Sequence, residues 1–138
     1  MALLLGFALV SALGVAHHYG LMAIRVLTPK SDNSPQVAII LVFVGLLALH
    51  TLEIVSFAVI YKILLNSGAF GALDGAHDEN WESLFYFSGI NFSTLGYTEI
   101  NTNGSIRMVS MMQSLGGFMV LTWSATFLYS VCERSWRN

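Results

Sequence analysis

Three long apolar segments constrain this 138-residue chain more than any other feature. They run over residues 3–27, 36–65 and 106–131, and helices of that length rise roughly 38–45 Å. The hydrocarbon core of a bilayer is about 30 Å thick, so each segment is long enough to cross it. Only 10% of the residues are charged, against about a quarter in soluble domains. The sequence therefore predicts an all-α membrane protein with three transmembrane helices.

The composition also excludes several classes of function. The net charge of −2 gives no basic surface for nucleic acid, and the single Cys132 cannot form an internal disulfide. No arginine recurs at every third position of an apolar segment, so the pattern of a voltage sensor is missing. One domain of this size is too small to enclose a conduction path unless several copies assemble.

The segments between the apolar runs differ in character. Residues 81–92 are amphipathic, and about twelve residues rise only about 18 Å, which is too short to span. Asn80 is a suitable N-cap for this short helix, and Glu82 lies in its first turn. We therefore expect a re-entrant half-helix, followed by a polar turn. The other connections are a linker at 28–35, a glycine-rich acidic loop at 66–80, and a tail at 132–138 too short to fold alone.

The polar turn over residues 93–99 is the stretch on which we expect function to depend. Irregular backbone at membrane depth is tolerated only where it is buried in protein or lines a watery cavity. A half-helix that enters from outside points its negative C-terminal end toward the membrane centre, where it favours a cation. Backbone carbonyls of the returning chain can then face a common axis if several copies meet.

The sequence FSTLGYTE in this turn resembles the T-V-G-Y-G-D selectivity filter of potassium channels. The neighbouring segments resemble that family too, because an aromatic-rich pore helix precedes the turn and a glycine-bearing inner helix follows it. The aromatic residues are Trp81, Phe85, Tyr86 and Phe87. The resemblance covers residues 36–131, as outer helix, pore loop and inner helix. Residues 3–27 are an addition to the two-helix pore module.

The resemblance implies that backbone carbonyls of four filter residues bind potassium ions. Thr94 matches the threonine of the innermost ion site, and Leu95 replaces valine with its side chain expected to point away from the axis. Gly96 and Tyr97 match outright. Thr98 departs from the pattern, because the family has glycine there in a left-handed conformation. Such a conformation costs a non-glycine residue about 1–2 kcal/mol, so we expect the outer end of the filter to be rebuilt around Thr98.

Three more residues are expected to support the filter. Glu99 replaces the acid at the filter mouth and keeps its charge on a longer side chain. In the family an aromatic donor on the pore helix often holds that acid, and Tyr86 is the candidate here. Ser93 begins the turn and completes this group.

Gly116 and Gly117 lie where the family carries a hinge glycine in the inner helix. Close helix packing is an equally good interpretation, because small residues are enriched at membrane helix interfaces. Polar and small residues also recur at helical spacing along this segment and predict either a lining for the cavity below the filter or hydroxyls bonded to their own helix. They are Ser110, Gln113 or Ser114, Gly117, Leu121 and Ser124.

His50 and Glu53 are three residues apart and share one helix face near the middle of the second segment. A charged acid at this depth costs about 2.5–3.5 kcal/mol. One interpretation is a mutually satisfied pair against Ser11 or Gly14, and the other is a proton or metal sensor that biases gating. His17 and His18 are expected to lie a helical turn or more away in depth.

These observations predict a passive cation channel that conducts potassium as a homotetramer and needs no cofactor beyond the permeant ion. The alternatives are a weakly selective monovalent cation channel, a non-conducting channel-like subunit, and an intramembrane metal enzyme. Arg25 and Lys30 flank the first linker and Arg134 and Arg137 lie in the tail, so the positive-inside rule places both in the cytoplasm and the N-terminus outside. Expected partners are further copies of the chain, the lipids of the cell membrane and an unidentified regulatory subunit; nucleic acid is not expected.

Overall fold

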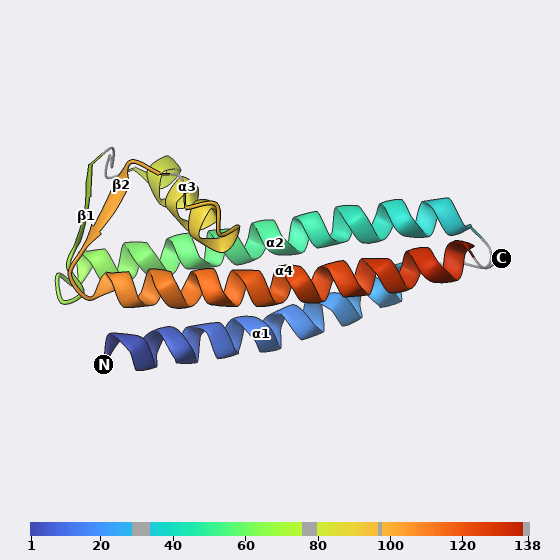
Figure 1. Ribbon diagram of the computed structural model, residues 1–138, viewed down its shortest axis with the longest axis horizontal. Coiled ribbons are helices and arrows are strands. Elements are labelled where there is room, and N and C mark those ends of the chain that lie inside the picture. Colours follow the sequence, from blue (N-terminus) through green and yellow to red (C-terminus); the bar gives the residue numbers. More distant parts are fainter. Residues whose placement is uncertain (29–33, 76–79, 97, 137–138) are drawn as a thin grey trace.

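The fold consists of three long helices with a short helix and two strands at one end (Figure 1). The computed structural model describes residues 1–28, 34–75, 80–96 and 98–136. The elements in order are α1 (Ala2–Leu27), α2 (Pro35–Asn66), β1 (Ala72–Gly75), α3 (Trp81–Phe92), β2 (Ile100–Asn103) and α4 (Ile106–Trp136). Helices α1, α2 and α4 are each long and apolar enough to cross a membrane. The predicted all-α membrane fold with a re-entrant helix is therefore confirmed, with a small sheet added.

The two ends of the polypeptide lie at opposite ends of the molecule, as an odd number of membrane spans requires. The N-terminus of α1 lies at the same end of the molecule as β1 and β2, and the C-terminal end of α4 lies at the opposite end (Figure 1). Side chains of α1, α2 and α4 pack together near that opposite end, around Ile24, Val42 and Leu46. The three helices thus form one bundle that runs the length of the molecule.

The C-terminal tail is not the short unstructured segment that the sequence predicted. Helix α4 continues to Trp136, and the last two residues lie outside the described part of the chain. Phe127, Leu128 and Val131, at the end of the apolar segment, pack against the apolar cluster of α1 and α2, so the helix is anchored at the point from which residues 132–136 extend it. Arg134 lies in the last turn, where a positive charge complements the helix dipole.

The predicted loop over 66–80 contains a strand that the sequence analysis missed. Strand β1 pairs with β2 in antiparallel register, from Ala72 opposite Asn103 to Gly75 opposite Ile100. Gly71 makes this pairing possible, since it has a φ of +105° and a Cβ there would overlap the carbonyl oxygen of Asn103. The two strands close off the segment that contains α3 and the polar turn, and hold its two ends together.

A buried hydrogen-bond chain fixes α3 between α2 and α4. The Tyr61 hydroxyl on α2 donates to Oε1 of Gln113 on α4, at 2.6 Å, and Nε2 of Gln113 donates to Oγ of Ser88 on α3, at 2.9 Å. The Ser88 hydroxyl donates in turn to the backbone oxygen of Ile54, at 2.7 Å. Tyr61, Ser88 and Gln113 are fully buried among apolar side chains. Polar groups in such surroundings are costly unless paired, so the chain specifies one position for α3.

We expect Gln113→Leu to lower the free energy of unfolding by about 1–3 kcal/mol, because it leaves the Tyr61 hydroxyl and the Ser88 carbonyl without their partner. Thermal unfolding in detergent, followed by size-exclusion chromatography, measures the loss. The double variant Tyr61→Phe/Gln113→Leu should lose less than the sum of the two single variants. Wild-type stability in Gln113→Leu would show that the chain of hydrogen bonds does not hold α3.

Candidate functional site

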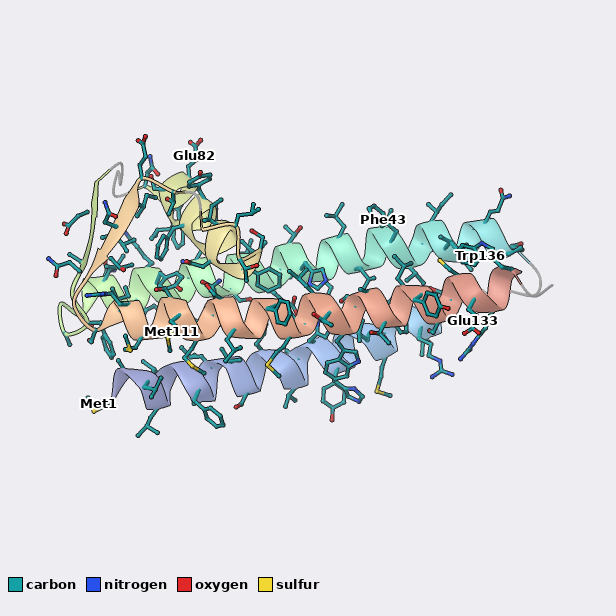
Figure 2. All side chains as sticks on the ribbon, viewed as in Figure 1. Met1, Phe43, Glu82, Met111, Glu133 and Trp136 are labelled. Carbon is teal, nitrogen blue, oxygen red and sulfur yellow. The ribbon has the colours of Figure 1, made fainter. Side chains whose placement is uncertain are left out.

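The candidate site is the C-terminal end of α3 and the turn that follows it. Helix α3 begins where its capping residue predicts, since the Ser83 N–H donates to Oδ1 of Asn80 at 2.8 Å. Its inner face buries Leu84, Phe87 and Phe92 in the apolar core. Figure 2 shows Glu82, at the opposite, N-terminal end of α3, pointing away from the long helices. The helix thus runs from a polar surface into the apolar bundle.

Helix α3 ends in a Schellman motif, which satisfies several of its terminal carbonyls. The Thr94 N–H donates to the carbonyl of Asn91 at 3.1 Å, and the Leu95 N–H donates to that of Ile90 at 3.2 Å. Thr94 adopts the left-handed conformation of this motif, with a φ of 58°. The Ser93 hydroxyl donates to the Gly89 carbonyl at 2.8 Å. Ser93 therefore supports the helix end from which the predicted filter begins.

The strained residue seen in the turn is Thr94. A β-branched residue with a positive φ is uncommon and costs conformational free energy. The sequence predicts this cost at Thr98, whereas the structure shows it at Thr94. The Thr98 hydroxyl accepts a hydrogen bond from the Ile100 N–H at 3.0 Å, which leads the chain into β2. Tyr97 lies outside the described residues, so left-handed geometry at the Tyr97–Thr98 step stays a prediction.

The turn itself is open to its surroundings. Thr94, Leu95 and Gly96 are exposed, and Leu95 keeps 70% of its surface accessible. Gly96 has a φ of +64°. In the described part of the chain, no backbone N–H donates to the carbonyls of Ser93, Thr94 or Leu95.

Glu99 and Tyr86 lie on the outer side of this site. Glu99 is exposed, and its backbone lies directly against Gly75 at the end of the strand pair. Tyr86 is on α3 with 49% of its surface exposed. The proposed bond between the two side chains stays a prediction.

Gly117 brings the end of α3 into contact with the middle of α4. A Cβ on Gly117 would overlap the carbonyl oxygen of Phe92, the last residue of α3. Gly117 is about 17 Å from the start of α4, at 1.5 Å per residue, so the turn after α3 begins beside the middle of this long helix. A Cβ on Gly116 would lie 2.7 Å from a methyl group of Val10 on α1. Both glycines thus serve close packing, and the hinge stays a prediction.

The polar stripe predicted to line a cavity faces the interior of the chain. Gln113 bonds to α2 and α3, and Ser124 to α1. Ser110 is bonded back to the Arg107 carbonyl of its own helix. Sequence periodicity identified a shared face, but the neighbours of that face are α1, α2 and α3. The exposed face of α4 carries other residues, among them Met111, Leu115, Phe118, Thr122, Thr126 and Tyr129.

His50 and Glu53 form part of a three-residue cluster. Nδ1 of His50 lies 2.8 Å from Oε2 of Glu53, and Nδ1 of His17 lies 2.9 Å from Oε1 of the same carboxylate. His17 therefore belongs to the site, and the expected difference in depth was wrong. Ser11 is bonded to the backbone of its own helix instead. His18, the next residue, stacks on Trp123 with ring centroids 5.8 Å apart.

These features together define a membrane pore module, with two long helices that flank a re-entrant helix and an exposed carbonyl-bearing turn. Residues 49–134, well over half of the chain, match the family model described as ion channel. The chain belongs to this family, the two-helix pore modules of potassium channels, and is a multi-pass membrane ion channel. The ion channel family is not a family of enzymes. Comparisons with curated proteins and with solved structures gave no match.

We expect Gly117→Ala to impair ion flux more than Gly116→Ala, because a methyl group at Gly117 meets the backbone at the end of α3, whereas one at Gly116 meets the Val10 side chain on α1. Flux per assembled channel in liposomes measures the difference. Equal and large losses of flux in both variants, with unchanged thermal stability, would favour a hinge over packing.

Proposed function

We propose that the protein conducts potassium passively through a filter made of backbone carbonyls from Thr94 to Tyr97. The observation that carries the proposal is the exposed turn at the inner end of α3, whose carbonyls at Ser93 to Leu95 accept no backbone hydrogen bond in the described part of the chain. Carbonyls at this depth cannot face lipid. A dehydrated cation is a chemically suitable partner, because rings of carbonyl oxygens replace its hydration shell.

A single chain supplies only one strand of such a filter. We therefore propose a homotetramer in which four turns face a common axis, with the exposed face of α4 lining the path below them. Thr122 and Thr126 on that face have hydroxyls bonded to the preceding turn of α4, so they present oxygen atoms without leaving a donor unpaired. The C-terminal end of each α3 adds its negative dipole to the same region. Potassium is the only non-protein component that this proposal requires.

The proposed orientation places the filter mouth and the N-terminus outside the cell membrane. Arg25 is in the last turn of α1 and Arg134 in the last turn of α4, both at the end opposite the strands. The positive-inside rule favours that end for the cytoplasm. Glu99 would then add negative charge at the outer mouth.

One observation favours a second candidate, a weakly selective monovalent cation channel. Thr98 stands where the resemblance expects glycine, and its hydroxyl is engaged by the Ile100 N–H. That bond draws the outer part of the turn toward β2. An outer filter shaped in this way offers fewer or wider ion sites and discriminates less between sodium and potassium.

The decisive experiment is ion flux into liposomes that contain the purified protein. We expect potassium flux well above sodium flux, from an assembly about four times the 15.1 kDa of one chain. Gly96→Ala should lower the flux of both ions, because the added Cβ meets nothing within 4 Å in one chain but Gly96 has a φ of +64°, which a residue with a side chain adopts only with strain. Equal sodium and potassium flux would support the second candidate. No flux of either ion at any pH tested would overturn the proposed function.

We expect Thr98→Gly to raise the selectivity for potassium over sodium, because glycine accepts left-handed geometry without the cost of about 1–2 kcal/mol and releases the Ile100 N–H. The permeability ratio of potassium to sodium, obtained from the reversal potential with one ion on each side of the membrane, measures this change. Thr98→Ser keeps the hydroxyl and should stay close to wild type. Unchanged selectivity in Thr98→Gly would contradict this account of the outer filter.

A further inference from the structure

We propose that His17, His50 and Glu53 form a binding site for a divalent transition-metal ion that joins α1 to the channel module. The donor atoms of the three side chains lie within 4.8 Å of one another. His17 is fully buried, and the side chains of Glu53 and His50 are only 5% and 14% exposed. This inference is independent of ion conduction and concerns a part of the chain, α1, that precedes the family match.

The Glu53 carboxylate brings the two imidazole nitrogens to one place between α1 and α2. Each imidazole presents its Nδ1 to a different oxygen of the Glu53 carboxylate, at 2.9 Å for His17 and 2.8 Å for His50. The two imidazole rings stack, with centroids 5.5 Å apart and an interplanar angle of 13°. Ligands at 2.0–2.1 Å from a tetrahedral zinc ion are separated by roughly 3.3 Å. The three donor atoms lie within 4.8 Å of one another, so a bound ion would replace the two hydrogen bonds and draw the donors closer together.

Ser124 provides the outer contact that such a site needs. Its hydroxyl lies 3.3 Å from Nε2 of His17 and is itself buried. A histidine that binds a metal through Nδ1 carries its proton on Nε2 and donates it to a neighbouring acceptor. The Ser124 oxygen is that acceptor, so α4 orients a ligand supplied by α1. The site thus involves three helices.

The charge balance favours a cation. The Glu53 carboxylate lies between two histidines, and no lysine or arginine forms an ion pair with it in the described part of the chain. An uncompensated carboxylate in a low-dielectric interior is costly. Two imidazoles and one carboxylate suit zinc or cobalt, with a fourth position left for water, whereas calcium and magnesium require oxygen ligands.

The position of the site connects it to the filter. The His50 ring lies 5.5 Å from the ring of Phe92, the last residue of α3, and Phe92 contacts Gly117 through its carbonyl oxygen. A bound metal fixes His50 against Glu53 and His17. It therefore restrains the helix end from which the filter begins.

Cobalt binding to the purified full-length protein, with any affinity tag removed, tests the proposal. We expect visible absorption bands of tetrahedral Co²⁺, saturating at one ion per chain and abolished by excess Zn²⁺. His17→Gln should lose the bands, and Ser124→Ala should weaken Co²⁺ binding by about 10–100-fold. His18→Gln is the matched control and should bind as the wild type does, because His18 faces Trp123 instead.

The proposal would be overturned if wild-type protein eluted as a folded assembly but showed no tetrahedral Co²⁺ bands. In that case a hydrogen-bonded triad that binds only protons would explain the geometry. Unchanged bands in folded His17→Gln would overturn the proposal equally. Because Co²⁺ binding is measured by absorption and not by ion flux, the experiment tests the metal site separately from ion conduction. Bands without ion flux would contradict only conduction, and flux without bands would contradict only the metal site.

Discussion

The structure depends on ending a helix inside a membrane without leaving its backbone unsatisfied. Helix α3 is too short to span, so its C-terminal carbonyls lie at a depth where water does not normally reach. A Schellman motif at Thr94 and the Ser93 hydroxyl satisfy the carbonyls of Gly89, Ile90 and Asn91. The carbonyls that follow, from Ser93 to Leu95, accept no backbone hydrogen bond in the described part of the chain. The proposed cation site depends on this division between paired and unpaired carbonyls.

The polar residues of the inner helix serve this arrangement from within. Gln113 bonds to Tyr61 and Ser88, and Gly117 admits the carbonyl of Phe92, so one side of α4 holds α3 along its length. Strands β1 and β2 hold the other end of the same segment. The turn can keep a costly left-handed threonine because α3 before it and the strand pair after it are both held in place. The turn is therefore positioned by contacts that lie outside it.

Length and hydropathy were enough to predict the spans and the half-helix, because the bilayer permits few alternatives. The strands were missed because each has four residues, and their pairing depends on Gly71, whose role is visible only beside Asn103. Periodicity along residues 110–124 identified a polar face but not its neighbours, so it could not choose between a cavity lining and hydroxyls bonded to their own helix, and it missed the bonds of Gln113 to α2 and α3. His17 was placed apart from Glu53 for the same reason, since sequence gives a residue's height on its own helix more reliably than the alignment of two helices.

Helix α1 determines which side of the pore module remains open to other subunits. It lies against α4 through two close glycine contacts, Gly6 with Met112 and Gly116 with Val10, and through the bond between His17 and Ser124. In the proposed homotetramer, a neighbouring subunit could not use the surface that α1 covers. The exposed face of α4 that includes Phe118 and Thr122 would then be left for the axis, and it lies on the same helix that receives the end of α3. Attachment of α1 by polar groups in an apolar bundle, where such contacts are costly to break, would therefore constrain the geometry of the proposed assembly.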